Sequence, residues 1–188
     1  MWIKLLLLCA TPCFAGCIDT AEVRACAFFP TSNRFKDNFG CVGANYQLEI
    51  GKTFGCCCEN QIWLGVDWYP KSGHLSSCGS SCIDILNASL GYKRFWCCGC
   101  FTPYLGIGPS FGYVWLENKR RCCSDCHPWK SKDQAFAVGG VARAGAQLNF
   151  CGPFFADLFV DYIVEVALFH RTAYIGGLKT GLGLGINF

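Results

Sequence analysis

Apolar side chains recur at every second position along most of this chain. The pattern is clearest at the end, where Leu182, Leu184, Ile186 and Phe188 are separated by glycine or asparagine. A period of two places successive side chains on opposite faces of a β-strand, whereas a helix repeats every 3.6 residues. The alternation therefore predicts an all-β protein.

The alternating residues fall into eight segments, each of which we predict to be a strand. These are residues 22–29, 41–50, 61–69, 83–94, 102–116, 134–148, 154–166 and 175–188. Most approach the ~9–11 residues with which a tilted strand crosses a bilayer. The connections near 30–40, 70–82 and 117–133 are long and polar, and the one at 149–153 is short. Long outer loops and short periplasmic turns are typical of membrane barrels. We therefore expect an eight-stranded, antiparallel, up-and-down transmembrane β-barrel.

One segment also fits a helix. Asp157, Asp161 and Glu165 are spaced four apart, so they would share one helical face. Because Phe, Val, Tyr and Ile fill the intervening positions, we favour a strand.

The N-terminus has the features of an export signal. Lys4 precedes the apolar run Leu5 to Leu8, and small residues follow around Ala15. We expect a signal peptide over residues 1–15, or 1–16, and an outer-membrane barrel over 17–188. A lipoprotein signal with a lipidated Cys17 is an alternative for the same region.

Composition excludes two classes of protein. Charged residues make up 15% of the chain and the net charge is +3, which argues against a nucleic-acid binder. Apolar residues make up 52%, which argues against disorder.

Cysteine is abundant. The chain has 17 cysteines, and loss of Cys9 and Cys13 with the signal leaves 15. This density in an exported chain indicates an oxidising compartment and disulfide bonds. Since 15 is odd, at least one cysteine is free, lipidated or joined to another chain. The candidates for disulfides or cross-links are Cys56, Cys57, Cys58, Cys97, Cys98, Cys100 and Cys151, and on the opposite side Cys78, Cys82, Cys122, Cys123 and Cys126.

The whole pattern resembles the small eight-stranded outer-membrane barrels of the OmpA/OmpX type. The resemblance rests on the final strand, with apolar residues at every second position up to Phe188, and on the stretch from Thr102 to Tyr113. In that family the terminal aromatic residue and the apolar residues before it are read by the barrel-insertion machinery. The implied signal is Leu182, Leu184, Ile186 and Phe188. The cysteine content departs from the family and resembles the disulfide-linked envelope proteins of chlamydia-type bacteria.

Charged residues occupy the parity that faces the barrel interior. They are Arg24, Glu49, Asp67, Lys93, Arg143, Asp157, Asp161, Glu165 and Lys179. An eight-stranded barrel is just wide enough for side chains to fill it, and unpaired buried charge is costly. We therefore expect these groups to pair and plug the lumen. A pore or ligand path is the alternative.

No catalytic, cofactor or metal site is expected, and we do not expect an enzyme. Asp157 and Asp161 would lie roughly 13 Å apart in a strand, too far for a glycosidase pair. Cys123, Cys126 and His127 match a haem-attachment spacing, and Cys122 would complete a set of zinc ligands. In so cysteine-rich a chain such spacings arise easily.

The sequence favours a structural or surface-interaction role in the outer membrane, with disulfides within the envelope. Partners would be membrane lipid, the insertion machinery and other cysteine-rich envelope proteins. The loop from Glu117 to Asp133 is net basic, so host-surface polyanions are a further candidate. The alternative is a periplasmic or lipid-anchored β-domain, stapled by disulfides, that binds a small ligand. That domain would have to cover the apolar face with other parts of the chain.

Overall fold

The computed structural model describes residues 18–55, 59–75, 79–96, 99–120, 129–150, 152–169 and 172–188. Residues 1–17, which include the expected signal peptide and Cys17, lie outside these ranges, as do Cys122, Cys123, Cys126 and His127. No helix in the described ranges is long and apolar enough to cross a membrane.

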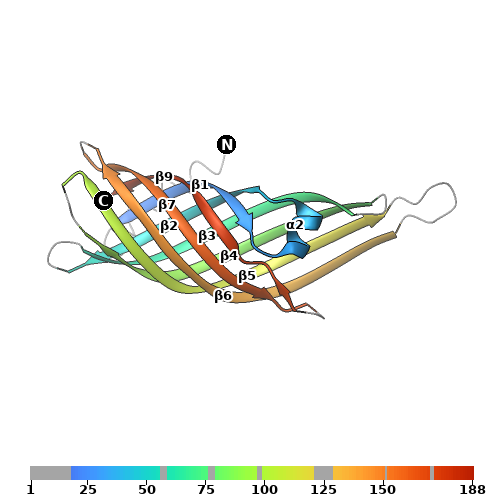
Figure 1. The fold of residues 1–188 in the computed structure, drawn as a ribbon. Coiled ribbons are helices and arrows are strands. Elements are labelled where there is room, and N and C mark those ends of the chain that lie inside the picture. The colour runs from blue at the N-terminus through green and yellow to red at the C-terminus, as the bar shows by residue number, and fades with distance from the viewer. Residues whose placement is uncertain are drawn as a thin grey trace, which may run out of the picture.

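Eight long antiparallel strands close into a barrel (Figure 1). They are β1 (Thr20–Pro30), β2 (Gly43–Phe54), β3 (Asn60–Leu75), β4 (Gly79–Phe95), β5 (Phe101–Arg120), β6 (Trp129–Asn149), β7 (Phe154–Ala167) and β9 (Gly177–Asn187). Each strand pairs with the next, and β9 pairs with β1 to close the circle. A two-residue strand, β8 (Ala173–Tyr174), adds to the end of β7. The predicted eight-stranded barrel is confirmed, and the ambiguous segment is the strand β7.

The two faces of the strands differ as the alternation predicts. In β1, for example, Arg24 and Phe28 are buried, whereas Val23 and Phe29 are exposed. Because every strand is paired on both sides over its central part, the barrel has no open edge there. The inward side chains form the core, and the outward ones form an apolar wall.

Two connections at one end of the barrel, β3 to β4 and β5 to β6, are shorter than predicted. β3 and β4 pair out to Leu75 and Gly79, and β5 pairs with β6 out to Arg120 and Trp129. The polar residues there continue the hydrogen-bonded ladder beyond the apolar stretch, so a pattern search based on apolar residues ends the strands too early. β5 and β6 extend visibly past the other strands at the right of Figure 1.

The connection after β1 contains a helix that the sequence did not predict. Helix α2 (Asn33–Phe39) buries Phe35 and Phe39. Phe35 packs on Phe28 and Tyr69, with ring centroids 6.4 and 6.1 Å apart. The two phenylalanines are four apart, one helical turn, but the segment is too short for periodicity to reveal it. The helix closes the same end at which β5 and β6 protrude (Figure 1).

Candidate functional site

Glu49 on β2 lies at the centre of the charged interior. Its carboxylate accepts hydrogen bonds from the Lys93 ammonium and from the Arg143 guanidinium. The Arg24 guanidinium is 3.4 Å from the same carboxylate. Arg143 also makes a two-pronged contact with Asp161, with both N···O distances 2.7 Å. One carboxylate thus joins cations from three other strands.

Arg24 connects Glu49 to two further buried carboxylates, those of Glu22 and Asp157. Its Nε and Nη2 donate to Glu22 at 2.6 and 3.0 Å, and Nη2 also donates to Asp157 at 2.6 Å. The Tyr104 hydroxyl donates to the same Asp157 oxygen at 2.7 Å. Glu22 was not among the predicted lumen residues, although it shares the parity of Arg24 and that signal was available in the sequence.

Aromatic rings form the walls around these charges. The guanidinium of Arg24 lies 4.5 Å from the ring centroid of Phe159, and that of Arg143 lies 4.2 Å from Trp63. Trp63, Tyr104, Phe155 and Phe159 are at most 2% exposed. The inward aromatics, also missed from the sequence, fill the space that the ion pairs leave and supply cation–π contacts.

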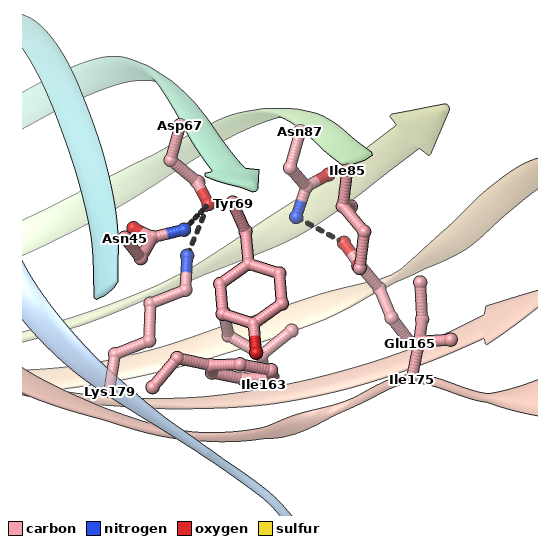
Figure 2. A pocket seen from close by; sticks show the side chains of 10 residues that line it. Asn45, Asp67, Tyr69, Ile85, Asn87, Ile163, Glu165, Ile175 and Lys179 are labelled. Carbon is pink, nitrogen blue, oxygen red and sulfur yellow. Dashed lines mark hydrogen bonds and ion pairs between the residues drawn. The ribbon is translucent and has the colours of Figure 1, made fainter. Parts of the chain in front are cut away.

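Nearer the α2 end, a second cluster surrounds a small cavity (Figure 2). Lys179 donates to Asp67, and Asn45 donates to the same carboxylate oxygen at 3.0 Å. Across the cavity, Asn87 donates to Glu165 at 2.6 Å. The cavity volume is ≈ 20 Å³, about enough for one water molecule. The structure therefore brings all nine predicted lumen residues into the interior, in two neighbouring clusters.

The described interior is filled rather than open. Its charged residues are all at most 5% exposed, comprising the acids Glu22, Glu49, Asp67, Asp157, Asp161 and Glu165 and the bases Arg24, Lys93, Arg143 and Lys179. Each base contacts at least one of these carboxylates. Such an arrangement cross-links the strands and leaves little room for a solute.

The outer wall carries two bands of aromatic residues. Trp68 and Tyr113 lie toward the α2 end, where Tyr113 contacts Phe136 at 4.9 Å between ring centroids. Phe101 and Phe154 are exposed toward the other end. Phe101 and Tyr113 are twelve residues apart on β5, roughly 30 Å after correction for tilt, which matches a bilayer core. The described residues leave this wall uncovered.

The described cysteines lie at different heights. Cys26 is buried in the lumen, where its thiol is 3.2 Å from the Asn45 Oδ1. Cys41 and Cys100 are exposed, and Cys82 is partly exposed. These four are free thiols in the structure. The other candidates, Cys56, Cys57, Cys58, Cys78, Cys97, Cys98, Cys122, Cys123, Cys126 and Cys151, lie outside the described residues.

The proposed insertion residues lie along β9 and at its end. Leu182, Leu184 and Phe188 are 65%, 71% and 69% exposed. Ile186 is half-buried on the same strand. The Phe188 amide donates to the Asp19 carbonyl at 2.8 Å, so the two ends of the described chain are held together.

Solved structures share this architecture. Neisserial surface protein A superposes with a TM-score of 0.58 at 12% identity, covering 90% of this chain and 96% of that one. The attachment invasion locus protein Ail of Yersinia pestis gives 0.52 at 13%, covering 90% and 98%. A major outer membrane protein of Thermus thermophilus gives 0.51 at 11%, covering 90% and 99%.

The chain has the fold of the small eight-stranded outer-membrane barrels. The exposed apolar wall between the two aromatic bands is the surface that a transmembrane β-barrel presents to lipid. No family model matches the sequence. No curated protein matches it either.

Proposed function

We propose that this outer-membrane barrel is a closed structural and surface-interaction protein rather than a channel or an enzyme. The observation that carries the proposal is the lumen, where Glu49 bridges Arg24, Lys93 and Arg143 in full burial. Ions crossing the barrel would have to break these contacts, since the network occupies the interior of a barrel this narrow.

Conductance tests this proposal. Purified protein inserted into planar lipid bilayers is expected to show little steady current. A large, stable, ion-selective conductance would overturn it. The substitution Glu49→Gln, which removes the shared carboxylate, is expected to raise the frequency of brief openings. Glu59→Gln, which removes the partly exposed partner of Arg94 at the rim, serves as the control.

We further propose that cysteines cross-link the protein within the envelope, in the manner of the cysteine-rich envelope proteins that the sequence resembles. The strand ends next to 56–58, 97–98 and 151 lie at the end of the barrel opposite α2, which by the short-turn rule is the periplasmic end. A disulfide requires Cα atoms within about 7 Å, whereas the bilayer separates the two ends by roughly 25–30 Å. Periplasmic cysteines can therefore pair only with one another or with another chain.

Non-reducing gels of intact envelopes test the cross-linking. A ladder of bands that collapses with reductant is expected, and a monomer band under both conditions would exclude it. Replacing Cys56, Cys57 and Cys58 by serine should weaken the ladder, because it removes the densest periplasmic group. Cys26→Ser should leave it unchanged, since that thiol is buried in the lumen.

A second candidate function is recognition of polyanions at the outer surface. It is supported by the basic composition of the segment from Glu117 to Asp133. It is also supported by the similar barrel Ail, which has been solved in complex with the heparin analogue sucrose octasulfate. Binding to sulfated glycans that weakens as salt rises is expected. Binding that is absent or insensitive to salt would remove this function.

A further inference from the structure

The strand extensions beyond the outer aromatic band have a lipid-facing side that carries lysines. On β5, Trp115 and Lys119 share the outward parity, and on β6 the outward residues include Lys130 and Lys132. The register places Lys119 directly opposite Lys130. These ammonium groups therefore stand above the aromatic band on the same wall of the barrel, rather than around its mouth.

The three lysines share one adjacent acid, Glu117, which lies opposite Lys132 in the register. Lys119 lies 3.6 Å from Glu117. Lys130 and Lys132 are exposed and have no carboxylate within ion-pairing distance among the described residues. Like charges directly opposite on paired strands are destabilising. Asp84 is the other acid on this face, and by register it lies beside Trp115, below the lysines. A ligand that brings negative charge would remove the repulsion.

The height of the lysines matches the lipid head groups. Glu117, opposite Lys132, is two residues beyond Trp115, and Lys119, opposite Lys130, is four residues beyond. With tilted strands these steps correspond to about 5 and 10 Å. The head-group layer is roughly 5–8 Å thick on each side of the hydrocarbon core. Flexible lysine side chains can reach phosphates throughout that layer.

We propose that Lys130 and Lys132, with Lys119, bind the phosphate groups of an outer-leaflet lipid whose acyl chains lie against the band of Tyr113, Trp115 and Phe136. The site is continuous with the lipid-facing wall, so one lipid molecule contacts both the apolar and the basic part. The inference goes beyond the proposed function, because its ligand is a lipid of the membrane itself, whereas the polyanion candidate rests on the composition of the whole segment from Glu117 to Asp133.

The test uses lipid A as the probe. Full-length mature protein in neutral detergent is incubated with lipid A and examined by native mass spectrometry. The wild type is expected to retain bound lipid A. The double variant Lys130→Gln/Lys132→Gln should bind it about tenfold to thirtyfold more weakly, at roughly 1 kcal/mol per basic side chain at an anionic surface.

Two controls decide whether the site is the one proposed. Arg34→Gln/Lys36→Gln removes the same charge from α2 at the same end of the barrel, and it should leave binding unchanged because α2 does not lie on the lipid-facing wall. Lipid A without phosphates should bind weakly to the wild type. Equal loss in both double variants, or equal binding of the dephosphorylated lipid, would overturn the proposal. Heat-modifiable gel mobility establishes that each variant is folded.

Discussion

Arg24 and Asp157 form an ion pair of 2.6 Å although their strands are not neighbours. β9 lies between β1 and β7, and the register places Gly183 opposite both residues. With no side chain at position 183, the guanidinium and the carboxylate meet directly over the backbone of β9. The ion pair therefore depends on a glycine that takes no part in it.

Gly183→Ala should destabilise the barrel by about 1–3 kcal/mol through this overpacking. A Cβ atom there would lie 1.9 Å from Glu22 Oε1 and 3.0 Å from Arg24 Cγ, so the Glu22 carboxylate must move. Urea unfolding in lipid vesicles measures the effect. Gly140→Ala is the matched control, because its Cβ would meet only the Gly108 carbonyl, at 3.4 Å. Equal stability of the two variants would contradict the role of Gly183.

Removing the central carboxylate, that of Glu49, should lower the stability of the barrel by more than Gly183→Ala does. Glu49→Gln takes away the charge that Lys93, Arg143 and Arg24 share, and breaking a buried ion pair costs about 3–5 kcal/mol. Glu59→Gln at the partly exposed rim should change stability by about 0–1 kcal/mol. The same unfolding assay compares the two, and a small effect at Glu49 would show that the network contributes little to stability.

Cys26 is expected to be the unpaired thiol of the mature chain. It is buried in the lumen next to Asn45, whereas the other described cysteines, Cys41, Cys82 and Cys100, are at least partly exposed. Alkylation after unfolding without reductant, followed by peptide mapping, should label Cys26 in most molecules. Slow labelling in the folded barrel is expected as well. Finding Cys26 in a disulfide would contradict the assignment.

Deleting Phe188 should reduce assembly and leave protein in the periplasm. The side chain is 69% exposed, so its removal takes little packing from the folded barrel. A loss of assembly would therefore report recognition by the insertion machinery and not instability. Phe188→Tyr keeps a terminal aromatic ring and should assemble normally. Fractionation of the envelope measures both, and normal assembly of the deletion would rule out the signal.

The strands and their inward faces were predictable because a bilayer and a filled lumen impose opposite polarities on alternate residues. β9 shows this most clearly, since each outward position after Lys179 is threonine or apolar, up to Ile186. The outer ends of β5 and β6 were not predictable in the same way, because both faces are polar above the bilayer. Parity also identified Arg24 and Asp157 as inward, but not as partners.

That partnership depends on the stagger of three strands and on the small residue between them. The alternation of apolar and polar residues predicts the face of the strand on which a side chain lies, but not its height in the barrel. It therefore predicts neither the stagger of the strands nor which residue lies between the two partners. The same limit applies to the cluster of Asp67 and Lys179, and to the cation–π contact of Arg143 with Trp63. The cavity beside Glu165 depends in turn on how those side chains fill the interior.

The glycine at position 183 also has an evolutionary consequence. Substitutions at positions 24 and 157 should be correlated among homologues, because loss of the Arg24 charge leaves the buried Asp157 carboxylate without its cation. Methods that read correlated positions as neighbouring strands would then place β1 beside β7 and omit β9. In a barrel this narrow, covariation between strands that flank a glycine-bearing strand therefore indicates contact over that strand, and strand order must be taken from the backbone ladder.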